Sequence, residues 1–205
     1  MVFIVTGLFA LFVVTRKEQG QDSGSLSPTP TQTIPEQIIP TSTPGVVTPS
    51  PKVNAPADWL IYTSPKFNFA LGYPKTMQVR EAGSKAVSFI LLGPTQGSAG
   101  SEIFDGFILT FTEDVYSGGS FANFVESERN SQANDPINQS VSSISQKAVG
   151  NHNGLTFSVS GFGDYTYLYF PASNNSYIQV AYIAADPDNS GYQSTIDKII
   201  STLTY

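Results

Sequence analysis

The sequence predicts an α+β fold, in which helices cover an antiparallel β-sheet. Short apolar segments recur between residues 58 and 185, and Asn, Gly and Pro separate them as they separate the strands of hairpins. Two further segments, 121–132 and 192–203, carry apolar residues at the three- and four-residue spacing of a packed helix. Hairpins in series with two helices among them are typical of an antiparallel sheet packed against helices.

The predicted domain begins at Asp58, and its first strands are 59–63 and 67–73. In the second strand apolar residues occupy every second position, so a pleated strand places all of them on one face. These residues are Phe67, Phe69, Leu71 and Tyr73. Pro74 is expected to end the strand, because proline has no N–H to donate to a neighbouring strand.

The middle of the domain holds two more predicted strands and a helix. Residues 87–92 are an apolar run that ends at Gly93, and residues 107–112 form the next strand. Ser120 is the expected N-cap of a helix over 121–132, because its hydroxyl can accept a hydrogen bond from an N–H of the first turn.

The last third of the chain is predicted to form two hairpins and a helix. The first hairpin pairs 143–149 with 155–161 across a turn at 151–154, where Asn and Gly accept positive φ. The second pairs 165–170 with 177–184. The helix 192–203 is expected to bury one stripe of its surface. That stripe is Ile196, Ile199, Ile200 and Leu203.

The segment before the domain predicts an anchor and a tether. Residues 2–15 are an apolar run of 14 residues, followed by Arg16 and Lys17, which indicates that 1–17 is an N-terminal membrane anchor or an uncleaved signal; a buried core helix is the alternative. Residues 18–57 contain eight of the 14 prolines among Thr and Ser, a composition typical of an extended, disordered linker. The predicted location is the cell membrane, as a single-pass protein with residues 58–205 outside the cytoplasm.

Composition excludes several classes of function. From residue 58 onward there are 7 Lys and Arg against 13 Asp and Glu, so the domain is acidic and no nucleic-acid partner is expected. The chain has no cysteine, which excludes disulfides, thiolate nucleophiles and Cys-based metal sites. We expect no cofactor apart from the calcium ion considered below.

Several aromatic positions resemble a known family. The opening Trp59-x-x-Tyr62, then Phe69 and Tyr73-Pro74, is similar to the start of the PsbP-like domains, and residues 196–203 are similar to the end of bacterial, membrane-anchored members. The resemblance covers about residues 58–205. It implies the α/β/α sandwich that PsbP shares with Mog-type proteins, and it implies no shared catalytic residues.

The loop before the last helix has the spacing of a calcium-binding loop. Oxygen-bearing side chains occupy positions 1, 3, 5, 9 and 12 of the loop 186–197, and Gly191 is at position 6, where a sharp turn is needed. The candidate ligands are Asp186, Asp188, Ser190 and Asp197, with Ser194 at position 9. The alternative is a polar turn that caps the helix.

Alternating tyrosines give a second candidate site. Tyr165, Tyr167 and Tyr169 line one face of a predicted strand. If a helix covers that face, the rings belong to the core with their hydroxyls at its edge. If the face is open, it is an aromatic platform for a glycan or a partner protein.

No arrangement of residues predicts catalysis. The only histidine, His152, falls in a predicted turn, where it is expected to be a surface residue, and no nucleophile or phosphate-binding motif occurs. The sequence therefore favours a non-catalytic, membrane-tethered binding or assembly module. The alternative is a small extracytoplasmic hydrolase or other enzyme whose site comes from scattered residues.

Overall fold

We analysed a computed structural model of the chain. The structure describes residues 52–63, 67–83, 85–97, 102–161 and 163–205, all of which belong to one compact unit, Val47–Tyr205. The predicted anchor and most of the predicted linker lie outside the described residues. Among the described residues, no helix is long and apolar enough to cross a membrane.

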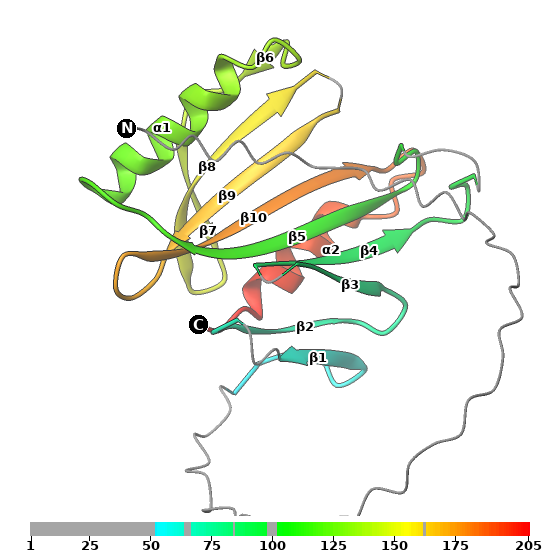
Figure 1. Ribbon diagram of the computed structural model, residues 1–205. Helices are drawn as coiled ribbons and strands as arrows, with labels where there is room; N and C mark the ends of the chain where they lie inside the picture. The colour runs from blue at the N-terminus through cyan, green and yellow to red at the C-terminus, as the bar shows by residue number, and fades with distance from the viewer. Residues whose placement is uncertain (1–51, 64–66, 84, 98–101, 162) are drawn as a thin grey trace, which may run out of the picture. The chain divides into compact units, whose positions relative to one another are not determined.

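The described chain forms ten strands and two helices (Figure 1). The strands are β1 Trp59–Thr63, β2 Ala70–Pro74, β3 Gln78–Ala82, β4 Ala86–Leu92, β5 Gly106–Val115, β6 Ser140–Val141, β7 Ser145–Val149, β8 His152–Ser160, β9 Tyr165–Pro171 and β10 Ser176–Ala185. The helices are α1 Phe121–Ala133 and α2 Tyr192–Ser201. The predicted α+β class is therefore confirmed, and the sheets are antiparallel throughout the described pairs.

One large sheet of eight strands carries the fold. Its strand order is β3-β4-β5-β10-β9-β8-β6, and β7 pairs with the other part of β8. Strands β5 and β10 are distant in sequence, yet they pair over their whole length, from Ser176 opposite Val115 to Ala185 opposite Gly106. This long pairing joins the meander β3-β4-β5 to the meander β8-β9-β10.

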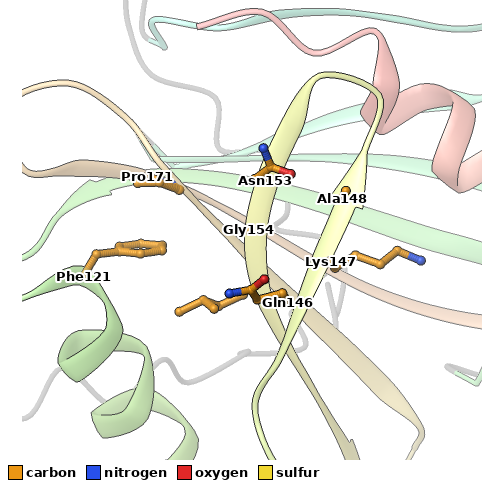
Figure 2. A pocket seen from close by; sticks show the side chains of 8 residues that line it. Phe121, Gln146, Lys147, Ala148, Asn153, Gly154 and Pro171 are labelled. Carbon is orange, nitrogen blue, oxygen red and sulfur yellow. The ribbon is translucent and has the colours of Figure 1, made fainter.

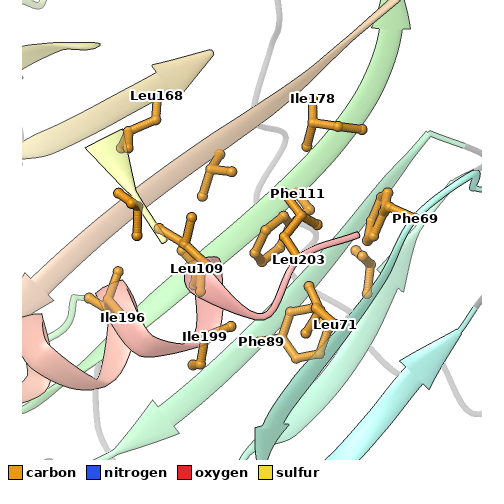
Figure 3. Close-up of a cluster of buried hydrophobic side chains, with 14 of the residues drawn as sticks. Phe69, Leu71, Phe89, Leu109, Phe111, Leu168, Ile178, Ile196, Ile199 and Leu203 are labelled. Carbon is orange, nitrogen blue, oxygen red and sulfur yellow. The ribbon is translucent and has the colours of Figure 1, made fainter. Parts of the chain in front are cut away.

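Helix α2 covers one face of the sheet and forms the larger core. Its stripe Ile196, Ile199 and Ile200 is fully buried, as the spacing predicts. These side chains meet Leu109 and Phe111 of β5 and apolar residues of β4, β9 and β10 (Figure 3). Most of the buried apolar side chains belong to this core, and burying one side chain of this size contributes about 1.5–3 kcal/mol.

Helix α1 covers part of the opposite face and forms a smaller core. Ser120 caps it as predicted, since its hydroxyl accepts from the Asn123 N–H at 3.2 Å. Val125 is fully buried and packs with Phe157 and Val159 of β8. The two helices therefore lie on opposite faces, which gives three layers in the order helix, sheet, helix (Figure 1).

The strands β1 and β2 form a separate two-stranded sheet against the α2 side. Thr202, just after α2, links to it: its hydroxyl accepts from the Gly72 N–H at 2.8 Å and lies 2.7 Å from the Ile199 carbonyl oxygen. A Cβ on Gly72 would lie 2.3 Å from the Cβ of Ala55, so the end of the predicted linker packs directly on β2.

The strands differ from the sequence expectations in two places. Strand β3 was not predicted, because Gln78–Ala82 is an exposed edge strand in which only Val79 packs on the core. The predicted turn at 151–154 is instead a two-residue turn at Gly150 and Asn151, since Val149 pairs with His152 and Gly150 has a φ of 60°. Gly154 instead lies in β8, where a Cβ would come within 2.5 Å of the Tyr169 carbonyl oxygen.

We predict that Thr202→Val lowers the free energy of unfolding by about 1–3 kcal/mol. Valine has nearly the same shape, but it leaves the buried Gly72 N–H without an acceptor. Chemical denaturation of both proteins measures the difference.

The matched control is Thr63→Val, because Thr63 lies exposed in β1. It should change the free energy of unfolding by less than about 0.5 kcal/mol. Equal losses in the two variants would contradict a specific role for the Thr202 hydroxyl.

Candidate functional site

The structure divides the three predicted tyrosines between core and surface. All three lie on the face of the sheet that α1 covers, but only Tyr169 is buried, at 2% exposure. Tyr167 is half-buried at the edge of the smaller core, and Tyr165 belongs to neither core. The core interpretation thus describes Tyr169, whereas Tyr165 lies beyond the cover of α1.

Tyr169 is held from three sides. Its ring lies 5.9 Å from Phe124 of α1 and 5.9 Å from Phe157 of β8, measured between centroids. Its hydroxyl accepts a hydrogen bond from the Gln179 amide at 2.7 Å. Burial raises the pKa of Tyr169 well above its usual value, and the neighbouring Glu128 carboxylate raises it further.

Glu128 lies on the inner side of α1, in line with Phe121, Phe124 and Val125. Among the described residues it makes no hydrogen bond and no ion pair, and burial raises its pKa. Burial, and after it the Asp114 and Glu128 carboxylates, raise the pKa of Tyr177, and burial raises the pKa of Tyr167 to about 12. Like ordinary tyrosine hydroxyls, they are protonated at neutral pH and can act as hydrogen-bond donors.

A row of apolar side chains crosses the part of this face that α1 leaves uncovered. Cross-strand partners link Ile90 to Ile108, Ile108 to Ile183, and Ile183 to Tyr165. We call these four residues the open row. Each is half-buried, and none belongs to either hydrophobic core. Leu92, two residues beyond Ile90 on the same face, extends the row and is 48% exposed.

The neighbouring row has small side chains and makes this face flat. Ser88 of β4 and Thr110 of β5 are cross-strand partners, and their hydroxyl oxygens lie 2.8 Å apart. Ala181 of β10 continues this row to Tyr167. Because Ser88, Thr110 and Ala181 have short side chains, the open row borders a shallow surface up to Tyr167 and does not line a deep cavity.

The loop before α2 is organised around Asp186. The Asp186 carboxylate accepts from the backbone N–H groups of Ser190, Gly191 and Tyr192, at 2.5, 2.9 and 3.1 Å. These N–H groups stand at the start of α2, where they have no partner inside the helix. Asp186 thus caps the helix, as the alternative to the calcium loop anticipated.

The other candidate calcium ligands do not share one partner. Asp188 and Ser190 are exposed, and Asp197 accepts from the Gln193 amide at 3.2 Å and lies 3.6 Å from the Lys147 ammonium. Within the described ranges, no three His, Asp or Glu side chains are grouped closely enough to hold a metal ion. Calcium binding by this loop stays a prediction.

A buried carboxylate joins the loop before β5 to α2. Asp105 is 1% exposed and accepts from the Thr95 N–H, the Thr95 hydroxyl and the Tyr192 hydroxyl, at 2.8, 2.7 and 2.7 Å. These bonds, that of Tyr192 first, lower the pKa of Asp105. The hydrogen bond to Asp105 in turn raises the pKa of the Tyr192 hydroxyl. A Cβ on Gly93 would collide with this carboxylate, so only glycine fits there.

His152 is not the surface turn residue that the sequence predicted. It is the first residue of β8, it is half-buried, and its Nε2 lies 2.6 Å from the Leu203 carbonyl oxygen. Its ring stacks on Tyr205, with centroids 5.1 Å apart. The prediction failed because the turn consists of Gly150 and Asn151 alone, so that His152 already belongs to β8 and contacts the C-terminal residues.

The open row was not predicted from the sequence. A signal for it exists, because β5 and β10 carry apolar residues at both odd and even positions, as strands buried on two faces do. The sequence pattern does not tell which of the two faces a helix leaves uncovered.

Comparisons with known proteins place the chain near two solved structures. No family model matches the sequence, and no curated protein does. The solution structure of cyanobacterial PsbP (CyanoP) from Synechocystis sp. PCC 6803 aligns over 74% of this chain and 94% of its own, at 11% identity and a TM-score of 0.46. A crystal structure from Bacteroides thetaiotaomicron VPI-5482 aligns over 70% of this chain, at 16% identity and a TM-score of 0.38. The aligned part spans 47% of the Bacteroides protein.

We predict that calcium at millimolar concentration raises the melting temperature of the full chain by several degrees relative to a chelator. An ion that binds only the folded protein stabilises it by RT ln(1 + [L]/Kd). The shift should vanish in Asp188→Ala, whose side chain takes no part in capping α2. Asp164→Ala, an exposed carboxylate elsewhere, should keep it. An unchanged melting temperature in the unmodified chain would leave Asp186 as a helix cap only.

We predict that the Asp105→Asn variant loses less of its free energy of unfolding than the unmodified chain does as the pH falls into the acid range. The pKa of Asp105 is lowered from 3.8 in the folded protein, so the stability that its charge contributes is present above that value. This contribution is lost as the pH falls through the folded-state pKa. The free energy of unfolding should therefore fall less steeply in the variant between about pH 5 and about pH 2.

The control for Asp105→Asn is Asp58→Asn, an exposed carboxylate at the start of β1. It should follow the unmodified chain. Parallel curves for Asp105→Asn and the unmodified chain would show that Asp105 is not the titrating group.

Proposed function

We propose that this chain is a non-catalytic, membrane-tethered binding module with a PsbP-like sandwich outside the cytoplasm, and that a partner protein binds the open row. The observation that supports it most directly is the open row itself. Four half-buried apolar side chains on adjacent strands belong to neither core. Apolar surface that a fold leaves contiguous and uncovered is typical of an interaction site.

The flatness of this surface favours a protein over a small ligand. Small-molecule sites are concave and enclose most of their ligand, whereas protein interfaces are broad and have apolar centres with tyrosine enriched. The row Ser88, Thr110 and Ala181 beside the open row leaves nothing to enclose a small molecule. Tyr165 and Tyr167, at one end of these two rows, bring an aromatic anchor with a polar tip.

The net negative charge of the domain indicates the charge of the partner protein. The domain from residue 58 onward carries a net charge of −6, so a second copy of the same acidic domain is repelled. A partner with an apolar centre and a basic surrounding surface is attracted and steered to the same face. The tether predicted in residues 18–57 suits this role, because it holds the domain at a distance from the membrane while keeping it near a membrane-bound partner.

A site-specific photo-crosslink tests this function. A photoreactive phenylalanine derivative replaces Ile108 or Ile183 in the full chain, which is then irradiated in its native cells. Each position should give the same discrete protein adduct. Ile183→Lys, combined with the crosslinker at 108, should lower the adduct yield at least about tenfold, because it places a charge in the centre of the interface.

The control position is Leu60 of β1, which is 49% exposed but belongs to the other sheet. It should give no adduct of the same mass. The proposal fails if Leu60 gives the same adduct, if Ile183→Lys leaves the yield unchanged, or if the adduct has the mass of two copies of this chain.

A further inference from the structure

A groove lies at the other end of the α1 face, apart from the open row. It is formed by the first residue of α1, the β7–β8 hairpin and the last residue of β9, and its volume is about 440 Å³ (Figure 2). This is within the range of about 300–1,000 Å³ that small-ligand sites occupy. The short side chains beside the open row make that surface flat by comparison, so the two surfaces suit different classes of ligand.

One wall of the groove is apolar and fixed in place. It consists of the Phe121 ring together with Leu155 and Pro171. The Phe121 ring is supported from behind by Tyr116 and Phe124, with centroids 5.7 and 6.4 Å away. A ring that is already held by its neighbours loses little conformational freedom when a ligand packs on it.

The polar side of the groove consists of two amides. Gln146 of β7 and Asn153 of β8 are both exposed, and they share one face of the hairpin, because Gln146 pairs with Leu155 and Asn153 is two residues before Leu155. Within the described residues neither side-chain amide makes a hydrogen bond to the protein. Each amide offers two N–H donors and one oxygen acceptor to a ligand.

The lining offers no free charge to a ligand. Lys147 is the one charged residue among the lining residues, and strand alternation turns it to the opposite face of the hairpin. There its ammonium lies 3.6 Å from Asp197, and Figure 2 shows it pointing away from Phe121. An ionic ligand would find no partner in the groove, and an anion would also be repelled by the acidic domain.

We propose that this groove binds a neutral sugar unit of a glycan. A sugar ring has a C–H face that can pack on Phe121, and a rim of hydroxyls that both donate and accept hydrogen bonds. Side-chain amides match such a rim, because each amide also donates and accepts. An uncharged ring with one apolar face and one polar edge is therefore the ligand that this combination of lining residues recognises.

The test is calorimetric titration of the full chain, in a detergent without a sugar headgroup, with chitotetraose, cellotetraose and maltotetraose. At least one oligosaccharide should bind with a Kd between about 10 μM and about 10 mM, as expected for a shallow site with few hydrogen bonds. The double variant Gln146→Ala/Asn153→Ala should weaken binding by at least about tenfold. Unchanged melting of this variant shows that the loss is not caused by unfolding.

The matched control is Asn151→Ala, an exposed amide in the turn of the same hairpin but outside the groove lining. It should bind as the unmodified chain does. No heat with any of the three sugars, or equal binding by the double variant, overturns the proposal. Binding of the neutral peptide Gly-Thr-Pro-Thr with the same dependence on Gln146 and Asn153, in place of any sugar, overturns the assignment to a sugar. None of these three outcomes bears on the open row, because the photo-crosslink tests that surface separately.

Discussion

The pairing of β5 with β10 is the interaction on which the rest of the structure depends. It joins two meanders that are otherwise local, and it continues over ten cross-strand pairs from Ser176 opposite Val115 to Ala185 opposite Gly106. Non-local pairing of this kind must offset a large loop-closure entropy. It does so because both strands bury apolar side chains in the larger core, namely Phe107, Leu109 and Phe111 of β5 and Ile178 and Val180 of β10, while Tyr177 of β10 packs against the smaller core.

The two faces are covered unequally, and the candidate sites follow from this. A helix is about 10 Å wide and neighbouring strands lie about 4.8 Å apart, so one helix covers about two strands. On one face α2 is assisted by β1, β2 and Leu203, which close the larger core. On the other face α1 packs on β6 and β8, no other element of the described part of the chain adds to its cover, and the open row lies beyond it. At the opposite edge of the sheet, a groove lies between the first residue of α1 and the β7–β8 hairpin.

Buried polar groups fasten the peripheral segments to this frame. Asp105 ties the loop before β5 to α2, Thr202 ties α2 to β2, and His152 contacts the C-terminal residues. Each is buried or half-buried and makes hydrogen bonds, as a polar group away from water must. None of the three could be assigned this role from the sequence, because their partners are between 51 and 130 residues away along the chain.

By itself the sequence determined the local elements. Alternation predicted the burial of Phe67, Phe69 and Leu71, although β2 begins only at Ala70 and not at residue 67 as expected. The Ser120 cap started α1 and the isoleucine stripe defined the buried side of α2, because these signals depend only on neighbours in sequence. Tertiary structure alone decided which strands became neighbours and which face α1 covers. Those choices separated buried Tyr169 from uncovered Tyr165 and brought Phe121 beside Gln146 and Asn153. They depend on contacts between distant residues, which no local pattern encodes.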